Sequence, residues 1–165
     1  MGAGMEDIYS MLNKNIGINF SDLLDNYNEI INYVSKNSDS FSVISNLNKP
    51  YSKQPPNYEH ENVLKVLEPF LERYVIGIKS WPGTITKDNH KVMITYRLCK
   101  ESRSLLKEMP NFFLPLENGL PEDICFFRNQ KPWFVTTSHE KTAFIVDATN
   151  EDVSYLKEMD ITVYE

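Results

Sequence analysis

Short apolar segments separated by turn residues are the feature that most restricts the fold of this chain. Each segment is rich in aromatic or β-branched residues, which favour strands. Their close spacing predicts a β-meander. Asn129 and Gln130 are predicted to form the two-residue tip of one hairpin, and TTSHEKT (136–142) the polar turn of the next. The segments are NFFLPL (111–116), DICFFRN (123–129), KPWFVTT (131–137) and TAFIVD (142–147).

Other parts of the chain have a helical period. In SDLLDNYNEIINYVSKN (21–37), six apolar residues fall on one stripe at 3.6-residue spacing, and Ser21 is the expected N-cap. Pro69 either kinks a helix predicted over 59–75, or the helix stops and restarts with Pro69 in the first turn of a second piece. Further helices are predicted at 100–109 and 150–159, the latter with a capping box, and a shorter one around residues 8–12.

Helices thus come first and strands dominate later, which is the order of an α+β protein. YVIGIKS (74–80) and KVMITYRLC (91–99) are predicted to pair antiparallel, and DITVYE to form a last strand. We therefore expect N-terminal helices packed on a mostly antiparallel sheet, with two inserted helices. Residues 38–58 start with a short apolar piece and continue as a Pro/Asn/Ser-rich connection.

One compact domain over residues 5–165 is the expected organisation, because the flanking helices suit a single unit. Residues 1–4 are expected to be a non-native leader, with Met5 as the natural start. No segment approaches the ~20 consecutive apolar residues of a membrane span, and no signal peptide is evident. A cytoplasmic location is expected, and the features suit many small intracellular bacterial proteins.

The net charge of the chain limits the kinds of partner that we expect it to bind. The chain has 17 Lys and Arg against 23 Asp and Glu, a formal net charge of -6. The basic residues are scattered, so a nucleic-acid backbone, which requires a basic face, is not the expected partner. An acidic domain of this kind suits a basic protein partner instead.

His139 is the best candidate for a titrating functional residue, because an imidazole changes charge near neutral pH. Its neighbour Glu140 is poorly placed to orient it on a strand, where adjacent side chains point to opposite faces. The pair also lacks the second histidine of HExxH. A polar turn is the simpler interpretation, as it is for His90, and catalysis by His139 would need a distant partner. His60 is most simply a polar residue on the solvated face in the first turn of the helix predicted over 59–75.

Three other residues are candidates for binding. Trp81, in SWPGT, is either an aromatic anchor on a loop or a side chain folded back over the core. Arg128 and Trp133 lie in CFFRNQKPWF, where basic residues alternate with aromatics as in proteins that bind single-stranded nucleic acid. The acidic chain favours a hairpin whose aromatics face the core.

Two acidic groups could do acid–base work or hold a hard cation, but a solvated turn and a helix cap are the simpler interpretations. These groups are Glu117, Glu122 and Asp123, and Asp147, Glu151 and Asp152.

No cofactor and no metal are predicted. The chain has no GxGxxG, GxxxxGK[ST], GxSxG or EF-hand pattern, and its three histidines are far apart. Cys99 and Cys125 do not form a CxxC motif. One disulfide is possible by count, but both cysteines are predicted to be reduced and buried.

The leading hypothesis is a non-catalytic intracellular binding or interaction protein. Neutralisation of a basic partner, as by an immunity or antitoxin-type protein, is one role consistent with the charge. The alternative is a small hydrolase or transferase that uses His139 with a distant carboxylate or Cys125. A third hypothesis is a homo-oligomer that associates through an exposed strand edge or Trp81.

Overall fold

The computed structural model describes residues 15–46, 61–87 and 90–165. Its strands are β1 (Ile16–Ile18), β2 (Ser40–Asn46), β3 (Leu71–Ile76), β4 (Ser80–Trp81), β5 (Thr84–Ile85), β6 (Lys91–Arg97), β7 (Glu122–Arg128), β8 (Lys131–Thr137), β9 (Thr142–Ile145) and β10 (Val163–Tyr164). Eight of them form one sheet in the order β10-β1-β9-β8-β7-β2-β6-β3, with antiparallel neighbours, and β4 and β5 pair separately. The predicted mixture of helices with a mostly antiparallel sheet is confirmed.

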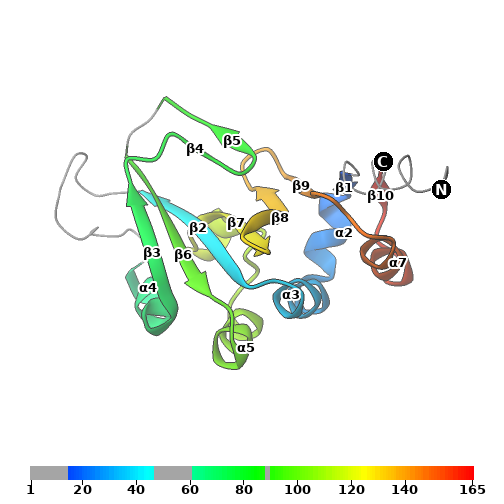
Figure 1. The fold of residues 1–165 in the computed structure, drawn as a ribbon, viewed down its shortest axis with the longest axis horizontal. Coiled ribbons are helices and arrows are strands. Elements are labelled where there is room, and N and C mark those ends of the chain that lie inside the picture. The colour runs from blue at the N-terminus through cyan, green and yellow to red at the C-terminus, as the bar shows by residue number, and fades with distance from the viewer. Residues whose placement is uncertain (1–14, 47–60, 88–89) are drawn as a thin grey trace, which may run out of the picture.

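Several helices lie on the side of this sheet opposite the small hairpin. The helices are α2 (Phe20–Asp25), α3 (Tyr27–Lys36), α4 (Glu61–Leu67), α5 (Lys100–Glu108), α6 (Pro115–Asn118) and α7 (Asn150–Glu158), with a 3-10 turn η1 (Glu68–Phe70). Figure 1 shows α3, α4 and α5 below the sheet and the β4–β5 hairpin above it.

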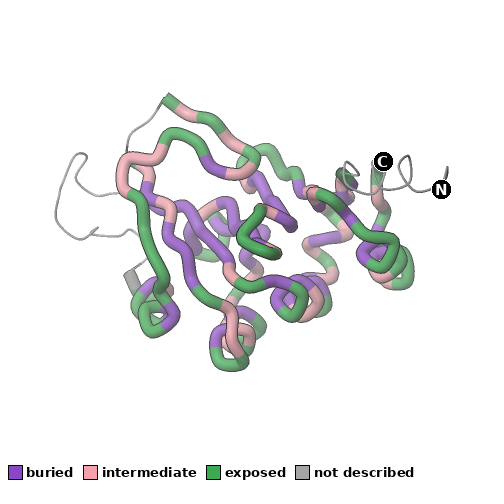
Figure 2. The backbone as a smooth tube through the Cα atoms, in the orientation of Figure 1, coloured by how far each residue is buried: buried purple, intermediate pink, exposed green. Residues whose placement is uncertain are grey.

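Each face of the sheet has its own apolar cluster. The larger cluster joins side chains of α3, α4 and α5, such as Ile30, Leu67 and Leu106, to inward-facing strand residues such as Phe126. Figure 2 shows this buried interior running through the central strands. The smaller cluster is formed by Cys125, Phe127 and Val135, with Phe144 and Val146 packed against it. Strand alternation places these residues on the hairpin side.

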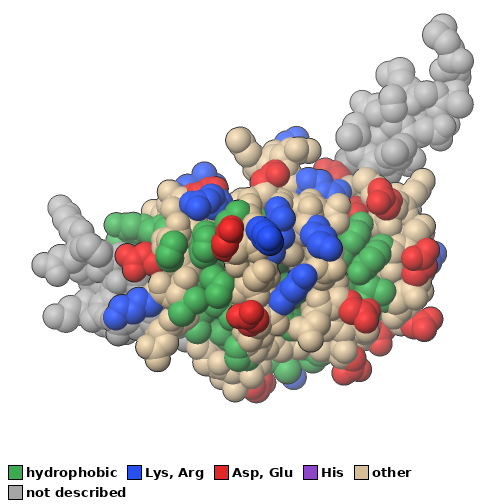
Figure 3. Space-filling view, turned by 90° about the horizontal axis from the view of Figure 1, so that it is seen from below, with side chains coloured by type: hydrophobic (Ala, Val, Ile, Leu, Met, Phe, Trp, Pro, Cys, Tyr) green, Lys and Arg blue, Asp and Glu red, His purple; other side chains and the backbone are tan. Residues whose placement is uncertain are grey.

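On the helix side, Lys and Arg side chains are intermixed with Asp and Glu (Figure 3). No helix among the described residues is long and apolar enough to cross a membrane.

The meander of β7, β8 and β9 is predicted correctly. Asn129 and Gln130 form the tip of the β7–β8 hairpin, both with positive φ (53° and 64°). TTSHEKT joins β8 to β9, with residues 138–141 in the turn. The β3–β6 pairing, α5, and α7 with its capping box between Thr149 and Asp152 are also confirmed.

The helix predicted over residues 21–37 divides in two. Asn19, not Ser21, caps its start, because the Asn19 side chain accepts a hydrogen bond from the Asp22 backbone N–H at 3.0 Å. Asn26 separates α2 from α3 and donates its side-chain amide to the Asp22 carbonyl at 2.8 Å.

Two further predictions are wrong. NFFLPL is not a strand: the Asn111 side chain accepts from the Phe113 backbone N–H at 2.9 Å, and Pro115 begins α6. The helix predicted over 59–75 stops at Leu67. Pro69 lies in the first turn of a second helical piece, as one of the two alternatives requires, but that piece is only η1, and the chain is extended from Leu71.

β2 corresponds to the short apolar piece at the start of residues 38–58, which was not predicted to be a strand, yet it sits between β7 and β6 in the middle of the sheet. Residues 41–45 are all buried, so the strand lacks the alternation of a half-exposed strand. The predicted leader, the short first helix and His60 lie outside the described residues. Cys99 and Cys125 are unpaired; Cys125 is buried as predicted, whereas Cys99 is only half-buried.

Candidate functional site

A pocket of about 420 Å³ lies where the β4–β5 hairpin meets the first residues of β6 and β7 and the β8–β9 turn. It brings together Trp81 and His139, two residues singled out from the sequence, although 58 positions separate them. We call it the hairpin pocket. It is lined by Trp81, Gly83, Thr84, Ile85, Thr86, Lys91, Glu122, Asp123, Thr137, His139 and Glu140.

Asp123 holds the walls of the hairpin pocket together. The β2–β7 register shifts beside it, and its φ is 52°, so it lies at a β-bulge that redirects its side chain. Its Oδ2 accepts from Trp81 Nε1 at 2.8 Å, and its Oδ1 accepts from the Ser138 backbone N–H at 2.7 Å. Ser138 Oγ in turn accepts from the Asp123 backbone N–H at 3.0 Å.

Gly83 lets the hairpin approach β8 closely. Its φ is +88°, and a Cβ at this position would lie 2.7 Å from Thr137 Oγ1 and 3.1 Å from Val135 Cγ1. Thr137 Oγ1 also donates to the Gly83 carbonyl at 3.4 Å. Only glycine combines this backbone conformation with this close contact.

The charge of the hairpin pocket is acidic. Three of its lining residues, Glu122, Asp123 and Glu140, carry carboxylates, against the single ammonium of Lys91. Lys91 Nζ lies 3.8 Å from Glu122 Oε2, so part of this charge is already balanced. Glu140 is exposed and has no ion pair within the described part of the chain.

His139 lines the hairpin pocket but is exposed at the β8–β9 turn. Asp123, a carboxylate that lines the same pocket, already accepts hydrogen bonds at both oxygens. Cys125 is not among the lining residues, and burial raises the pKa of its thiol well above the ordinary value. A buried neutral thiol is a poor nucleophile.

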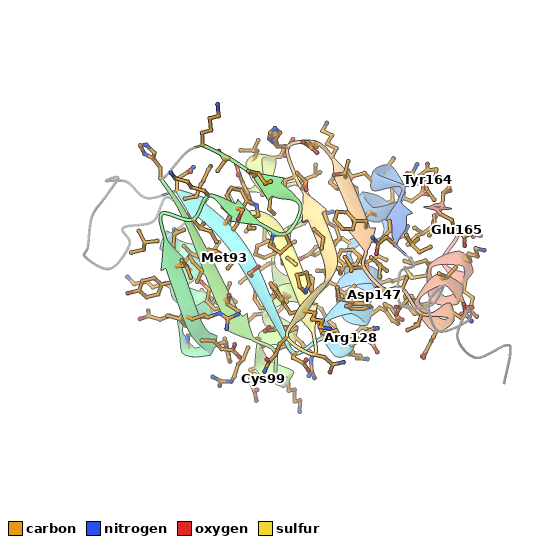
Figure 4. All side chains as sticks on the ribbon, turned by 45° about the horizontal axis from the view of Figure 1, so that its top comes forward. Met93, Cys99, Arg128, Asp147, Tyr164 and Glu165 are labelled. Atoms are coloured by element: carbon orange, nitrogen blue, oxygen red, sulfur yellow. The ribbon has the colours of Figure 1, made fainter. Side chains whose placement is uncertain are left out.

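Arg128 and Trp133 lie in a separate cluster around Asp152, where their side chains contact each other. The Arg128 guanidinium lies 3.7 Å from the centre of the Trp133 ring, and its Nη2 atom lies 3.2 Å from Asp152 Oδ1. Trp133 is 2% exposed and donates its indole N–H to Asp152 at 3.3 Å. Figure 4 labels Arg128 at the end of β7.

Asp152 is the centre of this cluster and is itself buried. It also accepts from the Tyr33 hydroxyl at 2.6 Å and from the Thr149 backbone N–H at 3.0 Å. Burial alone would raise the pKa of Asp152, but the hydrogen bonds from Tyr33, Thr149 and Arg128 outweigh it and hold the pKa below 3.8. Burial, together with the nearby carboxylate, raises the pKa of Tyr33.

The remaining acidic residues do not gather into a metal site. Among the described residues, no three His, Cys, Asp or Glu side chains are close enough together to hold a metal ion. Asp123 and Asp152 instead accept hydrogen bonds within the protein, and Asp152 caps α7.

Comparison of this chain with protein-family models, curated proteins and solved structures finds no match. The function of the site must therefore be inferred from its geometry and chemistry. Sequence reasoning identified Trp81 and His139 separately but did not join them, and it treated Asp123 as a solvated residue. A bulge with positive φ leaves no pattern in the sequence, so nothing distinguished Asp123 from other turn aspartates.

Proposed function

We propose that this chain is a non-catalytic binding protein whose hairpin pocket receives a basic side chain of a partner protein. The observation that carries the proposal is the charge of the hairpin pocket, where three carboxylates face one ammonium. A guanidinium or ammonium from a partner would find opposite charge there in a partly enclosed site, where charge pairs are worth more than in open water.

Two neighbouring groups suit a protein ligand. Ile85 lies on the hairpin, lines the pocket and is 88% exposed, which makes it a ready apolar contact beside the acidic site. Thr84 also lines the pocket, and its Oγ1 is buried with no hydrogen-bond partner within the described structure. A bound donor would satisfy this hydroxyl oxygen, whose burial is otherwise unfavourable.

The hydrogen bonds of Asp123 support binding over catalysis. Both carboxylate oxygens are engaged by Trp81 and Ser138, so this carboxylate is committed to holding the walls. An immunity or antitoxin-type protein that neutralises a basic partner is one role within the proposed class.

The test uses N-acetylargininamide and its uncharged isostere N-acetylcitrullinamide in NMR titrations of the labelled protein. We expect the arginine compound to shift the amide signals of Ile85, His139 and Glu140 and the indole signal of Trp81. The citrulline compound should leave them unchanged. Added salt should weaken the response, because the attraction is electrostatic. Equal shifts with both compounds, or arginine-specific shifts only outside the pocket, would contradict the proposal.

Glu140→Gln removes one exposed carboxylate from the pocket, and Glu117→Gln is its control, because Glu117 is exposed on α6 and does not line the pocket. The first variant should weaken arginine binding several-fold, and the second should leave it unchanged.

The competing hypothesis is a small hydrolase or transferase with His139 as general base. It is favoured by one observation, the presence of His139 in a pocket. His139→Ala would then abolish turnover of the unknown substrate, whereas under the binding proposal this variant should still bind N-acetylargininamide.

A further inference from the structure

The strand β3 forms one edge of the eight-stranded sheet, and its side chains are unusually exposed. Leu71, Tyr74 and Val75 are 37%, 41% and 45% exposed, and Val66 on the adjoining helix α4 is 48% exposed. Hydrophobic side chains gather at the end of the molecule where α4 and β3 lie, at the left of Figure 3. An exposed apolar edge strand is a template for pairing with another strand.

One hydrogen bond fixes which backbone groups of β3 face outward. The Gly77 N–H donates to the Lys91 carbonyl at 2.8 Å, which continues the β3–β6 register as a hydrogen-bonded pair. Because hydrogen-bonded and non-hydrogen-bonded pairs alternate in an antiparallel ladder, Val75 directs its N–H and C=O toward Met93. Tyr74 and Ile76 then direct theirs outward, where no described strand lies.

We infer that β3 pairs antiparallel with β3 of a second copy of this chain, with Val75 opposite Val75 of that copy. In this register Tyr74 of each copy is opposite Ile76 of the other, and these are the residues whose backbone groups face outward. Four backbone hydrogen bonds can form across the two-fold axis. The two Val75 residues form the non-hydrogen-bonded pair at the axis, where side chains approach most closely.

Charge selects this register over those shifted toward Arg73. Sliding one β3 strand along the other by two residues at a time keeps the outward-facing backbone groups of the two copies opposite each other, whereas a slide by one residue does not. One such shift places Arg73 opposite Val75 of the second copy, and the next places the two Arg73 residues opposite each other. In the register centred on Val75, all three opposed pairs are apolar or aromatic. β3 itself carries one Glu and one Arg, so the net charge of -6 does not oppose this contact.

The interface is small, with three paired residues on each side and added apolar surface from α4. Contacts of this size are typical of weak association. The dimer should therefore depend on concentration, and its two sheets should form one continuous sheet.

Light scattering over a concentration series tests the inference. We expect the measured mass of the wild-type chain to rise from 19.2 kDa toward twice that value as the protein approaches millimolar concentration. Val75→Lys should remain at the monomer mass, because it places two ammonium groups against each other. Leu116→Lys is the matched control: Leu116 is 75% exposed on α6, and this variant should dimerise like the wild type.

A wild-type chain that stays monomeric at millimolar concentration would overturn the inference, and so would a Val75→Lys variant that dimerises normally. Both variants should bind N-acetylargininamide as the wild type does, since neither residue lines the hairpin pocket. The two proposals can therefore fail separately.

Cross-linking tests the register without relying on a charged substitution. Cα atoms in a non-hydrogen-bonded antiparallel pair lie about 4.5 Å apart, within the range for a disulfide. Val75→Cys should therefore form covalent dimers under mild oxidation much faster than Leu116→Cys or the wild type, which retain Cys99 and Cys125. Cross-linking of Val75→Cys no faster than that of Leu116→Cys would overturn the register.

Discussion

The indole nitrogen of Trp81 donates a hydrogen bond to Asp123 Oδ2 at 2.8 Å, and this contact joins a two-stranded hairpin to the main sheet. β4 and β5 have only two residues each, which is too short for a hairpin to be stable alone. The hairpin therefore depends on Asp123 and on the close contact of Gly83 with β8. These contacts also shape the pocket.

Replacing Asp123 with Asn tests the first contact. The amide keeps one acceptor oxygen, so one of the two donors, Trp81 Nε1 or the Ser138 N–H, faces an NH2 group. We expect a loss of about 1–3 kcal/mol in the free energy of unfolding, measured with urea. Asp147→Asn is the control, because Asp147 has a similar φ of 51° but is exposed. Equal losses in both variants would show that backbone conformation, not the hydrogen bonds, is responsible.

Gly83→Ala tests the close approach of the hairpin. Gly119→Ala is the matched control: Gly119 has a φ of +65°, and an added Cβ there would meet nothing within 4 Å. Both variants acquire the cost of a left-handed alanine, about 1–2 kcal/mol. Gly83→Ala should lose about 1–3 kcal/mol more, because Thr137 and Val135 must move. Hydrogen exchange at the Thr84 and Ile85 amides should accelerate only in Gly83→Ala.

Asp152 should make the stability of the protein fall in acid. Its pKa is lower in the folded chain than its ordinary value of 3.8, so the folded state binds its proton less readily. This contribution to stability is complete above the unfolded pKa and is lost as the pH falls through the folded pKa. Asp152→Asn should cost about 3–5 kcal/mol near neutral pH. Its unfolding free energy should also change less than that of the wild type below about pH 4.

Urea unfolding at a series of pH values measures both effects. Glu151→Gln is the control, because Glu151 is its exposed neighbour in the first turn of α7. If Asp152→Asn retained the acid sensitivity of the wild type, that sensitivity would have to be assigned to other carboxyl groups.

Gln130→Gly should stabilise the β7–β8 hairpin. Gln130 has a φ of 64°, a conformation that costs an ordinary residue about 1–2 kcal/mol and costs glycine little. The greater freedom of glycine in the unfolded chain offsets part of this gain, so we expect a net gain of about 0.5–1 kcal/mol. Thermal unfolding would measure it. Asn129→Gly should gain less, since asparagine tolerates the left-handed region, and equal gains would contradict this explanation.

Local patterns predicted the elements whose signals lie within a few residues. The Asn129–Gln130 turn, the capping box of α7 and the apolar stripe of α3 are of this kind. β2 was missed because both of its faces are buried, which removes the alternation that marks a half-exposed strand. Phe112 and Phe113 have strand propensity but fill the core from a turn, so tertiary packing overrode their local preference.

The site was less predictable than the fold, because it depends on contacts between distant segments. Trp81 and Asp123 are 42 residues apart, and Tyr33 and Asp152 are 119 apart. The sequence identified His139 as a candidate and TTSHEKT as a turn, yet Ser138 and Thr137 hold the structure there. Their roles depend on the positions of Asp123 and Gly83 in the folded chain, and no pattern in a single sequence shows those positions.

The position of β1 in the sheet has a consequence for how the chain is assembled. Its two neighbours, β9 and β10, both belong to residues 142–164, although β1 itself begins at Ile16. During synthesis β1 must therefore wait, unpaired in this sheet, until β9 has been made, and its second partner β10 is made only near residue 164. Contacts between such distant segments form slowly, so we expect this end of the sheet to close last. Until then Ile16 and Ile18, both buried in the finished protein, remain accessible to chaperones or to other unfinished chains.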